Sequence, residues 1–156
     1  MSGTRPLRFL SPLHRATRQI ALHLKKPCGR AGVSGAEGHL VTYLRSYGPC
    51  RVGTLARVFG HQPSTLTSLL DRLESRALIR REVDAEDRRS FKVSLTAAGG
   101  RAADQLRQAL ERLEAEISAR LKPAELAGFQ AVMSAIAEIT RIEVNPTTPT
   151  RKGVKP

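Results

Sequence analysis

Residues 63–81 read PSTLTSLLDRLESRALIRR, and the periodicity of apolar residues changes within this stretch. Leucines at 66, 69, 70 and 73 recur at the spacing of one helical face, and Pro63 suits the first position of a helix. The opposite face carries only short or hydrogen-bonding side chains: Ser64, Thr65, Thr67, Ser68, Asp71 and Arg72. The helix should end near residue 76, because residues 78–83 are typical of a short strand.

The neighbouring segments complete a recognisable order of elements. A short helix expected over 53–59 presents Leu55, Ala56 and Phe59 to the core and stops at Gly60. Together with the helix from Pro63 it forms a helix-turn-helix pattern. Residues 90–95 alternate apolar and polar side chains, and the polar segment 84–89 separates them from the first strand. A hairpin directly after a helix-turn-helix predicts a winged helix.

Long helices are expected on both sides of this unit. One should cover 12–26, with Ser11 as its N-cap and Pro12 at its first position. Ser34 and Glu37 form a capping box that opens a helix with Leu40, Val41, Leu44 and Tyr47 inward. Thr96 should cap a helix that runs to about Leu121, with Ala103, Leu106, Leu110, Leu113 and Ile117 inward. A last helix begins at Pro123.

The last helix carries apolar residues on more than one face, which requires two packing partners. In so short a chain the second partner is plausibly another subunit, and the alternative is a monomer that folds both faces into its own core. The predicted class is mainly α with a small β-hairpin wing. We divide it into an N-terminal basic arm and helix for dimerisation (1–33), the winged helix-turn-helix region (34–96), C-terminal dimerisation helices (97–143) and a disordered tail (144–156).

Composition is consistent with one domain and narrows the classes of function. The chain has 156 residues, 40% of them hydrophobic, and a formal net charge of +12. Much of the excess charge lies at the ends, since seven basic and no acidic residues precede Glu37. Two cysteines and four histidines at unrelated spacings predict neither a metal site nor a disulfide scaffold. No cofactor site, nucleophile-base motif or membrane-spanning segment stands out, so we expect a non-enzymatic, cytoplasmic protein. The alternative for the Arg-rich start is a mitochondrial transit peptide.

Three stretches carry a resemblance to a known family: VGTLARVFG at 52–60, PSTLTSLLDRLESRALIRR at 63–81 and DAEDRRSFKVSLTAAG at 84–99. With these residues in this order, the chain resembles the MarR family of winged-helix transcription regulators. The resemblance implies a homodimer whose terminal helices form the interface and whose winged lobes face DNA. Family members usually repress promoters and are often released by small phenolic or lipophilic ligands or by cysteine oxidation. Ala77 stands where relatives commonly have glycine.

The resemblance gives the polar residues roles. At the wing, Arg89 would enter the minor groove, and Asp87 would hold the Arg89 guanidinium extended. Arg88 would lie on the sugar-phosphate wall. Asp84 and Glu86 would be solvated residues that lead up to the wing tip. At the recognition helix, which would enter the major groove, hydroxyl and amide side chains would reach base edges or phosphates. These residues are Gln62, Ser64, Thr65, Thr67 and Ser68, and the expected phosphate contacts are Arg72, Arg51 and Arg57. A solvated hairpin tip and a solvated Arg72 are the alternatives.

Two-fold symmetry predicts a near-palindromic operator in double-stranded DNA, with half-sites about one helical turn apart. The acid-free arm, with Arg5 and Arg8, either tracks flanking phosphates or does little.

Sensor candidates are Cys28, in an expected basic loop, and His14, His39 and Tyr43 in a cleft between the dimer and DNA lobes; Cys50 is expected to pack. The rival interpretation is a protein-interaction module with a structural winged helix, which the scarcity of aromatic residues disfavours.

Overall fold

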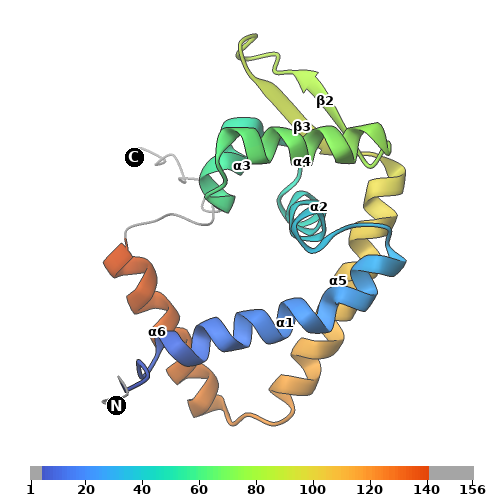
Figure 1. Ribbon diagram of the computed structural model, residues 1–156. Helices are drawn as coiled ribbons and strands as arrows, with labels where there is room; N and C mark the ends of the chain where they lie inside the picture. Colours follow the sequence, from blue (N-terminus) through green and yellow to red (C-terminus); the bar gives the residue numbers. More distant parts are fainter. Residues whose placement is uncertain (1–4, 141–156) are drawn as a thin grey trace, which may run out of the picture.

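The computed structural model describes residues 5–140. Its helices form two groups, and α5 (Ala97–Ser118) runs from one group to the other (Figure 1). α1 (Leu10–Arg30), α6 (Pro123–Thr140) and the far end of α5 lie at one end of the molecule. α3 (Val52–Phe59), α4 (Pro63–Ser75) and a β-hairpin lie at the other, and α2 (Gly35–Tyr47) lies between them. The predicted class, mainly α with a small hairpin wing, is confirmed.

The hairpin belongs to a three-stranded antiparallel sheet in the order β1-β3-β2. β2 (Ile79–Val83) pairs with β3 (Phe91–Leu95) along its whole length, with Ile79 opposite Leu95 and Val83 opposite Phe91. β1 (Cys50–Arg51) adds two residues to the other side of β3. β1 was not predicted, because a strand of two residues is too short to show any periodicity.

Most helix boundaries follow local signals. The capping box at α2 is present, since Ser34 Oγ accepts from the Glu37 N–H and Glu37 Oε2 accepts from the Ser34 N–H at 2.7 Å. Gly60 ends α3 in the left-handed region with φ 59°, and Thr96 caps α5. Ala77 has φ 52°, so alanine occupies a left-handed position after α4.

The prediction of a first helix over 12–26 is wrong at both ends. The N-cap is Phe9, and the Ser11 hydroxyl instead accepts from the Leu7 N–H. Pro27 lies inside the helix: it has no N–H to donate, but its carbonyl still accepts from Ala31 at 3.0 Å. The helix stops before Gly32, which has φ 69°. α5 also ends earlier than predicted, at Ser118.

The hydrophobic core lies between α2, α4, the sheet and the first half of α5. Its most deeply buried side chains are Leu40, Val41, Leu55, Leu66, Leu70, Leu73, Ile79, Val93 and Ala103. Tyr47, expected inward, is 38% exposed, and Tyr43 is buried in its place. The expected tail at 144–156 lies outside the described residues. Within residues 5–140 no helix combines the length and the apolar character that crossing a bilayer would require.

Candidate DNA-binding surface

The polar face of α4 is open to solvent. Its four leucines at 66, 69, 70 and 73 are buried, which turns the opposite side of the helix outward. That side exposes Gln62, Ser64, Thr65, Thr67 and Ser68, all predicted as contact residues. Two of the hydroxyls donate one turn back, from Thr67 to the Pro63 carbonyl at 2.9 Å and from Ser68 to the Ser64 carbonyl at 3.0 Å. These local bonds leave the hydroxyl oxygens able to accept further hydrogen bonds, and they hold both side chains close to the helix.

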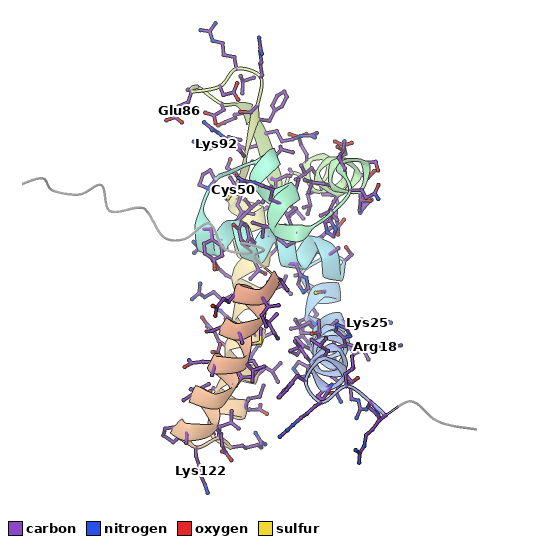
Figure 2. All side chains as sticks on the ribbon, turned by 90° about the vertical axis from the view of Figure 1, so that its left-hand side faces the viewer. Arg18, Lys25, Cys50, Glu86, Lys92 and Lys122 are labelled. Carbon is purple, nitrogen blue, oxygen red and sulfur yellow. The ribbon has the colours of Figure 1, made fainter. Side chains whose placement is uncertain are left out.

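The base of the wing differs from the expected solvated approach. Asp84 is only 2% exposed, so its assignment as a solvated residue is wrong. Its carboxylate accepts from the Glu86 N–H at 3.0 Å and from Arg51 Nε at 2.5 Å, and these bonds hold its pKa below the usual value. Arg51 also donates to Glu86 at 3.0 Å. Arg51, predicted to contact phosphate, therefore ties β1 to the wing through two carboxylates (Figure 2 labels Glu86 on the wing).

At the wing tip, Asp87 acts on the backbone. Its carboxylate accepts from the backbone N–H of Arg89 at 3.1 Å, and its carbonyl accepts from the Ser90 N–H and hydroxyl. The prediction that Asp87 holds the Arg89 guanidinium is wrong, because a short carboxylate closes the turn around its own main chain more readily. Among the residues described, no ion pair joins Asp87 to Arg88 or Arg89. Both arginines are exposed.

A second set of ion pairs fastens the hairpin to α4. The Arg81 backbone N–H donates to Glu74 at 3.1 Å, and its guanidinium contacts both Glu74 and Asp71, the latter at 2.8 Å. The Arg81 side chain is 26% exposed, compared with 43% for the Arg51 side chain at the base of the wing. Sequence reasoning missed it. The only available signal was two acidic residues three positions apart on the helix that precedes the strand.

Arg72 also has a partner that the sequence did not suggest. Its Nε donates to Glu37 Oε1 at 3.2 Å, and Arg76 contacts the same oxygen at 2.8 Å. Glu37 is buried, which by itself would raise its pKa, but the Ser34 N–H and the guanidiniums of Arg76 and Arg72 lower that pKa to about 2. Arg57 on α3 is exposed and stays a predicted phosphate contact.

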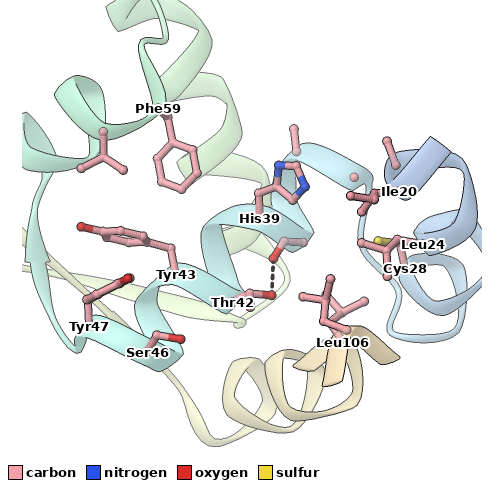
Figure 3. A pocket seen from close by; sticks show the side chains of 16 residues that line it. Ile20, Leu24, Cys28, His39, Thr42, Tyr43, Ser46, Tyr47, Phe59 and Leu106 are labelled. Carbon is pink, nitrogen blue, oxygen red and sulfur yellow. Dashed lines mark hydrogen bonds between the residues drawn. The ribbon is translucent and has the colours of Figure 1, made fainter. Parts of the chain in front are cut away.

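A cavity of about 740 Å³ opens between α1, α2, α3 and α5 (Figure 3). His39 and Tyr43 line it as predicted, but His14 does not. Figure 3 shows the Tyr43 ring beside Phe59, whose ring centroid lies 5.4 Å away. The Tyr43 hydroxyl is the one buried side-chain polar atom among the described residues that lacks a hydrogen-bond partner. Such an atom in an apolar wall is a hydrogen-bonding point for a bound molecule.

The cysteines do not have the setting of a redox sensor. Cys28 lies on α1 and is 6% exposed, so its placement in an open basic loop is wrong, and burial raises the pKa of its thiol. Cys50 is buried in β1, its thiol donates to the Gly48 carbonyl at 3.3 Å, and burial raises its pKa as well. The packing role predicted for Cys50 agrees with this burial.

Helices α2, α3 and α4, followed by the exposed hairpin of β2 and β3, define a winged helix-turn-helix protein. Residues 33–91 match the model of the MarR family. Two Bacillus subtilis (strain 168) proteins are similar in sequence: the transcriptional repressor MdtR, 34% identical over 70 residues or 45% of each chain, and the uncharacterised regulator YwhA, 26% identical over 106 residues, 68% of this chain and 76% of that one.

Among solved structures, S. aureus MepR in its DNA-binding conformation superposes with a TM-score of 0.78 at 18% identity, covering 86% of this chain and 99% of that one. This likeness concerns the fold. The family model, which covers residues 33–91, and this likeness of fold both agree with the resemblance found in the sequence.

Proposed function

We propose that the chain is a transcriptional repressor that binds a near-palindromic site in double-stranded DNA as a homodimer. One observation carries the proposal: the exposed polar face of α4 and the exposed Arg88 and Arg89 belong to elements that Arg81 joins into one body. A surface that is fixed before contact loses little conformational entropy when it binds. The similarity to MdtR, a transcriptional repressor, and to MepR in its DNA-binding conformation supports the same function.

In this proposal the two elements read different grooves. The first turns of α4 enter the major groove, where Gln62 can pair with adenine and the hydroxyls of Ser64, Thr65, Thr67 and Ser68 reach base edges or phosphates. Arg89 enters the minor groove, whose negative potential favours a guanidinium, and Arg88 lies along the sugar-phosphate wall. Asp87 contributes by closing the turn that presents both arginines. Arg57 and Arg72 contact phosphates and set the register.

The proposed dimer rests on α6 and the adjoining ends of α1 and α5. None of the 18 residues of α6 is buried, although the helix carries large apolar side chains. Among them, Phe129 is 55% exposed and Ile139 is 81% exposed. Ile117, near the end of α5, is also exposed despite its predicted inward position. So much apolar surface on adjacent helices is typical of a subunit interface. Replacing Phe129 with Asp should convert the dimer to a monomer in light scattering, and a dimer that persists would count against this interface.

The proposed effector is a small, largely apolar molecule held in the cavity by a hydrogen bond to the Tyr43 hydroxyl. The lining is mainly aliphatic and aromatic, with His39 and Ser46 among its few polar groups. A panel of phenols and neutral aromatic compounds, followed by thermal shift, would find such ligands. Replacing Tyr43 with Phe should weaken the polar members of the panel more than the apolar ones. Equal effects on both would remove Tyr43 from the site. The two buried thiols give release by oxidation no comparable support.

The function itself is tested by selecting bound duplexes from a randomised DNA pool. We expect an enriched near-palindrome with half-sites about one helical turn apart. Replacing Arg89 with Ala should then weaken binding to the selected duplex by about tenfold or more without dissociating the dimer. Failure to enrich any sequence would favour the rival interaction module. Wild-type affinity in the Arg89 variant would remove the wing from the interface.

A further inference from the structure

The carboxylate of Glu37 is shared by two helices. Oε2 accepts from the Ser34 N–H at 2.7 Å and so begins α2, whereas Oε1 faces Arg72 and Arg76 of the recognition helix at 3.2 and 2.8 Å. The Glu37 side chain is 5% exposed. This buried carboxylate lies between the start of α2 and α4, and both of its oxygens have donors.

Arg76 extends the connection to the corner between α1 and α2. Its Nη1 donates to the Gly32 carbonyl at 2.5 Å, and its Nε donates to the Arg72 carbonyl at 3.1 Å. Arg76 therefore bridges the end of α4, the α1–α2 corner and the capping carboxylate. A guanidinium with three fixed acceptors has little rotational freedom, and the helix that carries it shares that restriction.

Two roles for Glu37 make opposite predictions. If it merely neutralises Arg72 and Arg76, removing its charge frees two guanidiniums for phosphates and strengthens DNA binding. If it fixes the orientation of α4, removing the charge weakens specific binding although the protein becomes more positive. The geometry favours the second role, because the carboxylate is buried and bonded on both oxygens, whereas Arg72 is 57% exposed and can reach outward while Glu37 holds its Nε.

We propose that Glu37 is a positioning residue for DNA recognition: it fixes α4 against the first turn of α2 through Arg72 and Arg76. This inference rests on the proposed function. It also connects the two surfaces described above, since Gly35, Ala36 and Gly38, the neighbours of Glu37 in that turn, line the cavity. A molecule that displaces the first turn of α2 moves the carboxylate on which α4 rests.

The test compares full-length Glu37→Gln with wild type on the duplex selected from the randomised pool. Glutamine keeps the shape and can still accept from Ser34, but it presents an uncharged amide to the arginines. Glu111→Gln is the matched control, because it removes the same charge from an exposed pair with Arg107 on α5. Arg76→Gln and the double variant complete a double-mutant cycle. The Nε–H resonance of Arg72, which donates to Glu37 Oε1, reports the contact without DNA.

We expect Glu37→Gln and Arg76→Gln each to weaken specific binding by about tenfold, the double variant to be little weaker than either, and Glu111→Gln to bind as wild type or better. The slowly exchanging Nε–H resonance of Arg72 should disappear in Glu37→Gln. Equal or tighter binding by Glu37→Gln, or additive losses in the double variant, would overturn the inference. If wild type enriches no duplex while the Arg72 Nε–H resonance is intact, the proposed function has failed, and the resonance shows that the contact itself has not.

Discussion

Two consecutive glycines at the start of α5 should respond in opposite ways to the same substitution. A Cβ on Gly99 would lie 1.9 Å from the Leu78 carbonyl oxygen, whereas a Cβ on Gly100 meets nothing within 4 Å. Ordinary contact requires more than 3 Å, so Gly99→Ala must move the backbone of residue 78 or of α5 by over 1 Å. Neither glycine has positive φ, so this difference comes from space and not from strain.

The cost follows from the bonds at that junction. Leu78 O accepts from the Thr96 N–H at 3.1 Å and from the Thr96 hydroxyl at 3.2 Å, and the same hydroxyl contacts the Ala77 carbonyl at 2.6 Å. Losing the bonds donated by the Thr96 N–H and by its single hydroxyl proton, at about 1 kcal/mol each, with about 1 kcal/mol of repacking, gives a loss of about 3 kcal/mol for Gly99→Ala. Gly100→Ala should gain about 0.5–1 kcal/mol, because alanine restricts the unfolded chain and suits a helix interior.

Urea denaturation at a fixed protomer concentration measures both variants, since oligomer stability depends on concentration. At about 2–4 °C per kcal/mol, Gly99→Ala should also melt roughly 6–12 °C lower and Gly100→Ala a few degrees higher. Gly99→Ala within about 1 kcal/mol of wild type would refute the argument, because it would mean that the junction between β2 and α5 yields freely. A loss in Gly100→Ala comparable to that in Gly99→Ala would show that the effect is not steric.

Three further predictions concern stability and reactivity. Ala77→Gly should raise the free energy of unfolding by about 1 kcal/mol, because φ 52° is costly for alanine; a lower urea midpoint would contradict this. Cys28 and Cys50 should react with iodoacetamide at least about tenfold more slowly than an unfolded control at pH 7.5, because burial raises both pKa values; matching rates would show that the thiols are open. The pKa of Glu37 falls from 4.5 to about 2 on folding, so its stabilisation is complete above about pH 5 and is lost towards pH 2. Wild type should lose about 3 kcal/mol more than Glu37→Gln over that range in acid denaturation, and parallel curves would contradict the assignment.

The features predicted from the sequence are those determined by neighbouring residues. Ser34 and Glu37 satisfy each other within one turn, Gly60 ends its own helix and Thr96 caps the helix that follows it. The leucines of α4 needed only their own spacing to show which face is outward. Each of these signals lies within eight consecutive residues, so no knowledge of the tertiary structure was required.

The findings for Asp84, Arg72 and Cys28 depend on residues distant in sequence. Asp84 is buried because Arg51, 33 positions earlier, reaches it from β1. Arg72 contacts Glu37 across 35 positions, which its own helix could not indicate. Cys28 is buried because Pro27 fails to end α1 and the thiol packs within the core. Polar residues, unlike the leucines, carry no periodicity that identifies their partners, so their roles could be assigned only after the fold was known.

The ion pairs that hold the wing have a consequence for how salt dependence should be interpreted. Arg51 with Glu86 and Arg81 with Asp71 are pairs whose acidic partners are well exposed, so dissolved ions screen them together with the DNA phosphates. Raising salt would then weaken association twice, by competing for the phosphates and by loosening the protein surface that meets them. The slope of log affinity against log salt is commonly converted into a number of phosphates contacted. For this protein that conversion would give too large a number of phosphates. The excess would report the salt sensitivity of the ion pairs that hold the wing.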